Sequence, residues 1–247
     1  MKRDKRISKK LGAKLALTLL ALAELCACVT AQENTTDYWM DKAEEFAYNS
    51  SFEEVISSLD EALKTDPGNE TILIREALYL GIVGKVNESS QTYEKALSIL
   101  DEILLKDPDD AEAWQKKASV LGSLNRRNES LAAYEETLEA FNRRIEKDSK
   151  DMDAWIGKGN ALLNLGKWDE ARNAYNKAIE VDPQDYRAWG RKAEVIGRIG
   201  DINESMEAYD RTIELIPAND TREQADYWMS KAEVLAIAGG RLAEALE

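Results

Sequence analysis

The chain has 247 residues, with 47 Asp and Glu against 33 Lys and Arg, and its formal net charge is −14. It contains no His and only two Cys, which excludes zinc sites built on His or paired Cys and nucleophiles activated by His. With 32% charged residues and only four Pro, the composition favours helices with solvated faces over a disordered acidic tail. A conventional enzyme, a metal site and a bound cofactor are therefore not expected.

Residues 1–31 are organised like a secretory signal peptide. Seven cations and one acid between positions 2 and 14 precede an apolar run from Leu15 to Ala23, and small residues follow. The run is too short to cross the hydrocarbon core of a bilayer, which takes about 20 apolar residues. An uncleaved membrane anchor or an amphipathic arm is the alternative interpretation.

Two processing sites compete at the end of this segment. Val29, Thr30 and Ala31 place small residues at the offsets that an ordinary signal peptidase uses, with cleavage before Gln32. The tetrapeptide Leu-Cys-Ala-Cys that ends at Cys28 instead resembles a bacterial-type lipobox, although Cys at its second position is atypical. We expect a secreted or cell-surface protein cleaved after Ala31, with a lipid anchor on Cys28 as the alternative.

The chain that follows is strongly acidic. Residues 1–31 hold seven positive and two negative charges, and subtracting this net +5 from −14 leaves −19 for residues 32–247, which contain no Cys. A surface of this charge repels the phosphate backbone, so a nucleic-acid partner is not expected.

One sequence frame recurs six times beyond residue 35. An aromatic or Leu anchor is followed four residues later by a small residue, and the anchors are 34, 41, 41, 34 and 39 residues apart. The anchors are Trp39, Leu73, Trp114, Trp155, Trp189 and Trp228, and the small residues are Ala43, Ala77, Ala118, Gly159, Ala193 and Ala232. Each copy holds two apolar stretches at helical spacing, and stacking of copies supplies the core that one helical hairpin lacks.

Residues 152–185 resemble the tetratricopeptide repeat. With Met152 counted as position 1, the marks of that family at positions 4, 8, 20, 24, 27 and 32 are met by Trp155, Gly159, Ala171, Tyr175, Ala178 and Pro183. The other copies keep part of this pattern. The resemblance implies an all-α fold, a right-handed superhelical solenoid of helix-turn-helix repeats, with about five full repeats and a truncated sixth.

The frame predicts repeats at residues 36–69, 70–110, 111–151, 152–185 and 186–224, and a partial repeat at 225–247. The two 41-residue copies exceed 34 residues by about two helical turns, so an extended second helix is expected in each. The last copy is expected to hold a first helix and a stub, Arg241–Glu247. Its uncovered apolar face would self-associate, meet a partner or continue in a longer array.

The triplet Asn-x-Ser/Thr occurs seven times, where chance predicts about one. The acceptor positions are Asn34, Asn49, Asn69, Asn87, Asn128, Asn203 and Asn219. Three of them occupy position 18, and their Ser at position 20 replaces the Ala of the family, which favours use as glycosylation sites. Helix N-capping and shared repeat ancestry are the alternative. This density of sites behind a signal peptide suggests an archaeal cell envelope.

The resemblance implies that a partner contacts positions 2, 5, 6, 9, 12 and 13 of the first helices. The family's clamp for a C-terminal carboxylate needs Lys at position 5, which none of the six copies has. The nearest substitute is Arg187, Arg191 and Arg198 on one helical face, beside Asn160 and Asn164, where an acidic peptide or another anion would fit. A solvated basic stripe balanced by Glu194 is the alternative.

Position 12 is Gly in three copies, at Gly81, Gly122 and Gly197. These residues either open the floor of the groove or permit tight helix packing. The sequence does not separate the two.

Together these features predict a non-catalytic scaffold of the cell envelope or exterior that binds a protein or peptide in its concave groove. A carbohydrate- or cell-wall-binding or processing factor is the alternative, with Trp168 as the one Trp available for stacking on a sugar. A cytoplasmic co-chaperone is the third hypothesis, but it requires that residues 1–31 are not a signal.

Overall fold

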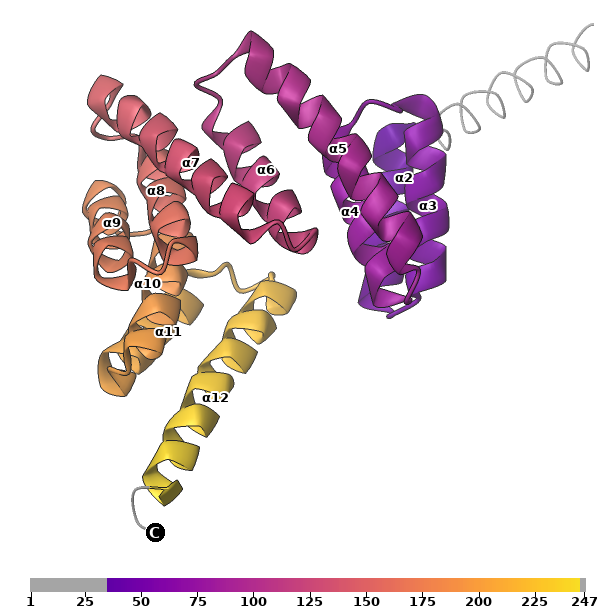
Figure 1. The fold of residues 1–247 in the computed structure, drawn as a ribbon. Helices are drawn as coiled ribbons and strands as arrows, with labels where there is room; N and C mark the ends of the chain where they lie inside the picture. The colour runs from indigo at the N-terminus through magenta and orange to yellow at the C-terminus, as the bar shows by residue number, and fades with distance from the viewer. Residues whose placement is uncertain (1–34, 245–247) are drawn as a thin grey trace, which may run out of the picture. The chain divides into compact units, whose positions relative to one another are not determined.

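The computed structural model describes residues 35–244, and every regular element in that range is an α-helix (Figure 1). In chain order the helices are α2 (Thr36–Tyr48), α3 (Phe52–Thr65), α4 (Glu70–Ile82), α5 (Val86–Lys106), α6 (Ala111–Ser123), α7 (Arg127–Lys147), α8 (Met152–Asn164), α9 (Trp168–Val181), α10 (Tyr186–Ile199), α11 (Ile202–Leu215) and α12 (Thr221–Glu244). The predicted all-α repeat fold is thereby confirmed. Between residues 35 and 244, no helix has the length and apolarity that a membrane crossing requires. The predicted signal peptide, Cys28 and Asn34 lie outside the described residues.

The chain divides into two compact units, with the boundary inside α5 between Ile99 and Leu100. In the first unit, α2 packs on α3 and α3 packs on α4. In the second unit, each helix from α6 to α12 packs on the next one along the chain, and α10 also contacts α8 and α12. Contacts between alternate helices are typical of stacked hairpins, so the second unit is a helical solenoid.

The turn inside each hairpin depends on one left-handed residue at position 15. Gly84, Gly166 and Gly200 have φ angles of 82°, 73° and 104°, and Ser50 and Asn125 take φ angles of 56° and 59° at the same position. Glycine adopts this conformation without a Cβ penalty, which explains why it serves as the turn residue in three of the five hairpins. The first helix of the following repeat is capped by an Asn or Asp whose side chain accepts hydrogen bonds from backbone N–H groups, as at Asn69, Asp110, Asp151 and Asp185.

The core of the second unit is built from aromatic rings seated on small residues. Tyr175 is fully buried, together with Leu162, Ala171 and Ala178. A Cβ at Gly159 would overlap the Tyr175 ring, so the absence of a side chain at position 8 allows the aromatic residue at position 24 to pack there.

A Trp ties the loop before each of three first helices to that helix. The indole Nε1 donates a hydrogen bond to a loop carbonyl six residues earlier, from Trp114 to Pro108 (2.9 Å), from Trp155 to Ser149 (3.0 Å) and from Trp189 to Pro183 (3.1 Å). A Lys three residues after the Trp lies over each ring, at 4.9, 5.2 and 5.5 Å from its centroid. The anchor residues therefore hold successive repeats together as well as filling the core.

The helices α5 and α7 have 21 residues each, whereas α6, α8, α9, α10 and α11 have 13 or 14. They lie in the two copies with a 41-residue spacing. Leu97 and Leu104 of α5 are both buried, so the seven-residue addition keeps the apolar stripe on one side of the helix.

The last helix differs from the expected pattern at both ends. It starts at Thr221 rather than 225, and the Asp220 side chain accepts the Glu223 N–H at 3.1 Å. The 39-residue spacing exceeds 34 residues by five, and most of these extra residues form an additional first turn of α12. It then continues without a turn through Arg241 to Glu244. The helix thus includes Arg241 to Glu244, the described part of the expected stub Arg241–Glu247.

Candidate interaction groove

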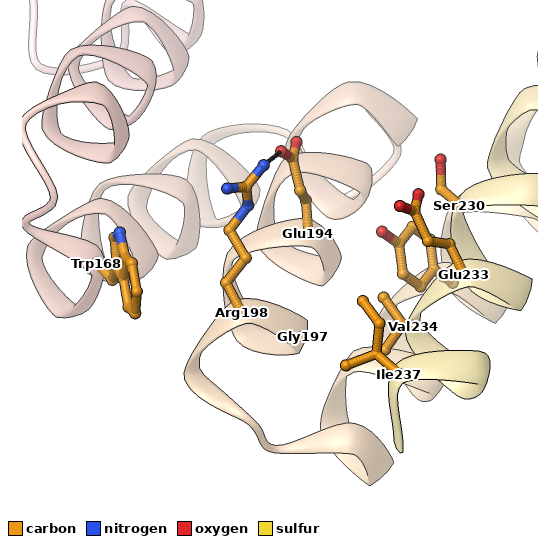
Figure 2. Close-up of a pocket in the computed structure, with 9 residues that line it drawn as sticks. Trp168, Glu194, Gly197, Arg198, Ser230, Glu233, Val234 and Ile237 are labelled. Carbon is orange, nitrogen blue, oxygen red and sulfur yellow. Dashed lines mark hydrogen bonds and ion pairs between the residues drawn. The ribbon is translucent and has the colours of Figure 1, made fainter. Parts of the chain in front are cut away.

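A cavity of about 450 Å³ lies in the second unit between α10 and α12, which are each the first helix of a repeat. Figure 2 shows Arg198 joined to Glu194 on α10, with Trp168 on one side and Glu233, Val234 and Ile237 of α12 on the other. The lining residues are Trp168, Glu194, Gly197, Arg198, Tyr209, Ser230, Glu233, Val234 and Ile237. We call this cavity the α10–α12 groove.

The α10–α12 groove is formed mainly by the frame positions that the resemblance implies for partner contacts. Glu194, Gly197 and Arg198 stand at positions 9, 12 and 13 of α10, and α12 supplies positions 6, 9 and 13. Its lining is mixed, with charged groups next to apolar side chains, as is usual for sites that recognise peptides or small molecules.

Gly197 allows α10 and α12 to approach closely. A Cβ at this position would lie 3.0 Å from Val234 Cγ2 and 3.1 Å from Ser205 Oγ. At Gly81 and Gly122 the nearest atom would be a Ser Oγ at 3.4 Å, which is ordinary contact. Of these three glycines, Gly197 is the one that lines the groove and is closely packed.

The predicted arginine cluster is divided by its ion pairs. Arg191 and Arg198 both pair with Glu194, at 3.2 and 3.1 Å, whereas Arg187 pairs with Asp153 at 3.0 Å and with Asp185 at 2.7 Å. Of the three arginines, only Arg198 lines the groove. The carboxylates that balance these side chains lower the attraction of this face for an anion.

The two predicted Asn residues of α8 bond within the protein. Asn160 Oδ1 accepts the hydroxyl of Tyr175 at 2.9 Å, and Asn164 Nδ2 donates to the Asn160 carbonyl at 2.9 Å. Burial raises the pKa of Tyr175 above its usual range, and the nearby charge of Arg191 opposes part of that rise. Asn160 thus positions a core tyrosine.

Tyr209 is the equivalent tyrosine of the next repeat, and its surroundings differ. Its side chain is only 2% exposed, and within the described residues its hydroxyl has no hydrogen-bond partner. Burial, with smaller contributions from the negative charges of Glu194 and Glu233, raises the pKa of Tyr209 to about 12, and the positive charge of Arg198 opposes this rise. Its hydroxyl therefore lies close to the charged groups of the groove.

Two family models, both described as tetratricopeptide repeat, match residues 111–142 and 153–185. Tetratricopeptide repeats are therefore detected in these two segments of the chain. No curated protein is significantly similar to it in sequence.

One solved structure described as a tetratricopeptide repeat (TPR) protein shares the fold. TTC0263, titled a thermophilic TPR protein of Thermus thermophilus, is 16% identical with a TM-score of 0.54 over 81% of this chain and 99% of its own. Yeast Tom70 is 18% identical with a TM-score of 0.49 over 85% of this chain and 42% of its own. MamA of Desulfovibrio magneticus RS-1 is 18% identical with a TM-score of 0.39 over 75% of this chain and 97% of its own. The likeness to TTC0263 concerns the fold alone.

The predicted glycan acceptors within the described residues lie at or next to the ends of helices. Asn49, Asn87, Asn128, Asn203 and Asn219 are exposed. The three at position 18 are the second residues of α5, α7 and α11, so they are not N-caps. Asn69 is the N-cap of α4, and both ends of its amide are bonded, to the Thr71 and Ile72 N–H groups and to Asp66.

The Ser residues that complete three of these triplets have a structural use of their own. Ser89, Ser130 and Ser205 are buried, and each donates its hydroxyl to the carbonyl at position 8 of the same repeat, at 2.6, 2.7 and 2.8 Å. Ser in place of the family's Ala at position 20 therefore gains a hydrogen bond, which by itself explains its presence.

Sequence reasoning singled out Trp168, Gly197 and Arg198 but missed the α12 side of the groove. Applying the contact positions to the sixth TPR copy points to Ser230, Glu233 and Ile237, which do line it. Within the described residues, no cluster of acidic, Cys or His side chains is arranged to hold a metal.

Proposed function

We propose that the chain is a non-catalytic interaction scaffold that holds a segment of a partner protein in the α10–α12 groove. The observation that carries this proposal is a cavity of about 450 Å³ lined at TPR contact positions by both charged and apolar side chains. The net charge of −14 makes nucleic acid an unsuitable partner.

A peptide selection tests the scaffold proposal. A random peptide library is selected against the full chain, and the binders are retested on Ser230→Trp, which fills the groove from its rim. Ser90→Trp is the matched control, because both hydroxyls donate to a carbonyl four residues earlier in their own helix and Ser90 is not one of the residues that line the groove. We expect binders that Ser230→Trp weakens by about tenfold or more and Ser90→Trp does not. A library without such binders contradicts the proposal.

We further propose that the scaffold works outside the cell, exported through residues 1–31 and N-glycosylated. The exposure of five acceptor Asn side chains is compatible with modification. The intact mass of the protein from its native cells tests this. A chain starting at Gln32 with hexose-type increments supports it, a diacylglyceryl increment on Cys28 supports the lipoprotein alternative, and an unmodified chain from Met1 overturns it.

Carbohydrate binding is the second candidate function, because Trp168 is 43% exposed in the same groove as Glu194 and Glu233. Sugar recognition commonly pairs an aromatic face with carboxylate acceptors of hydroxyl hydrogen bonds. A glycan panel tests it: binding that Trp168→Leu abolishes favours this candidate over the peptide scaffold.

Self-association is the remaining partner proposal. α12 exposes Trp228, Met229 and Leu235, an apolar face that a second copy would cover. A molar mass from light scattering that doubles with concentration supports it, and a constant monomer mass contradicts it.

A further inference from the structure

We propose that the α10–α12 groove selects a cationic side chain, Lys or Arg, of the partner and holds it between the Glu233 carboxylate and the Tyr209 hydroxyl. This inference rests on the proposed scaffold function and names the chemistry of the partner.

The first argument is the unequal use of the two groove carboxylates. Glu194 is neutralised by Arg191 and Arg198, at 3.2 and 3.1 Å. Glu233, at the same frame position of the next repeat, is exposed and forms no ion pair within the described residues. The open negative charge of the groove is therefore on the α12 side, where a cation from outside would meet it.

The second argument is the hydroxyl of the buried Tyr209 at the groove wall. In the preceding repeat, the tyrosine at position 24 donates to Asn160 at position 9. In this repeat, position 9 is Glu194, which is held by two arginines, and the Tyr209 hydroxyl is left without a hydrogen bond within the described residues. This hydroxyl is not a buried unsatisfied atom but opens on the groove, so it can accept a hydrogen bond from a ligand donor.

The third argument is the apolar surface around these two groups. Val234 and Ile237 line the same side as Glu233, and Trp168 faces them across the groove (Figure 2). The methylene stem of Lys or Arg packs on such surface while its charged end reaches a polar group. The net charge of −14 also attracts a cationic segment over longer distances.

The test compares two peptides on the full chain. Acetyl-Ala-Leu-Lys-Leu-Ala-amide and its analogue with norleucine in place of Lys are titrated into isotopically labelled protein, and amide shifts of α10 and α12 report binding. We expect the Lys peptide to bind about fivefold more tightly, which is the upper end of what an ion pair with an exposed carboxylate contributes.

Two variants locate the effect. Glu233→Gln is expected to weaken the Lys peptide about fivefold and Tyr209→Phe about threefold, with no change for the norleucine peptide. Glu207→Gln is the control, an exposed carboxylate of α11 outside the groove. Equal affinity for the two peptides, or unchanged Lys binding by Glu233→Gln, overturns the inference.

The two proposals fail separately. Groove-dependent library binders without Lys or Arg, insensitive to Glu233→Gln, overturn the cation inference and leave the scaffold proposal standing. A library with no groove-dependent binder removes the scaffold proposal itself.

Discussion

At the scale of single residues, position 7 shows how the repeats differ from one another. It is Lys in five copies, and Lys117 pairs with Asp101 of the preceding repeat at 2.6 Å, as Lys231 does with Asp210. In the second copy position 7 is Glu76, which meets Asp60 instead. Burial, together with the hydrogen bond and negative charge of Asp60, raises the pKa of Glu76 to about 7.

This arrangement predicts a pH-dependent effect of Glu76→Gln. A carboxyl whose pKa is higher in the folded than in the unfolded state makes folding less favourable as pH rises from about 4.5 to 7. Because Gln resembles the protonated form, Glu76→Gln should stabilise the protein by about 1 kcal/mol at pH 8 and by almost nothing at pH 5. Urea unfolding of both proteins at the two pH values measures the difference.

The control is Glu53→Gln, an exposed carboxylate in the first turn of α3. Its effect should be equal at pH 5 and pH 8. A gain from Glu76→Gln that does not depend on pH would contradict the interaction with Asp60.

At the scale of elements, the distance between paired helices depends on the size of the residues at the repeat positions that are occupied by Gly, Ala or Ser. Gly159 lies under the Tyr175 ring and Gly122 has only Ser130 Oγ near the site of a Cβ, at 3.4 Å. Both glycines are helical, so Ala gains the same propensity at each. The atoms around each glycine therefore decide whether substitution by Ala raises or lowers the stability of the protein.

Gly122→Ala should stabilise the protein by up to about 1 kcal/mol. Gly159→Ala should destabilise it by about 1–3 kcal/mol, because the ring of Tyr175 has to move. Chemical denaturation of the two variants against the parent chain measures both. Stabilisation by both would mean that the aromatic packing adapts freely.

Much at this scale was accessible from the sequence. The helical hairpins follow from the anchors and small residues, and the glycine turns follow from Gly84, Gly166 and Gly200. Asn125 and Ser50 were not recognisable as turn residues, because neither type requires a positive φ. The start of α12 at Thr221 was missed because a 39-residue spacing does not say where its extra residues lie. The α10–α12 groove and the Asp60–Glu76 contact depend on which side chains of neighbouring repeats meet, and a frame of single-repeat positions does not contain that information.

At the scale of the whole molecule, charge is the dominant feature, with −19 over residues 32–247. Salt screens both the repulsion among the excess carboxylates, which destabilises the fold, and the attraction within exposed ion pairs, which stabilises it. Because each exposed ion pair contributes little, the relief of repulsion is the larger of the two effects. Raising NaCl from low to physiological levels should raise Tm by about 2–5 °C. Calorimetry measures the shift, with tetramethylammonium chloride as the control for specific sodium binding. A Tm that falls with salt would show that the ion pairs dominate.

The indole bonds from Trp114, Trp155 and Trp189 to the loop carbonyls have a practical consequence. Each indole proton lies at one junction between consecutive repeats, and its exchange with solvent deuterium requires this hydrogen bond to break. The chain therefore carries natural reporters at three successive junctions. Comparing their exchange rates would rank the junctions by local stability and show where unravelling begins.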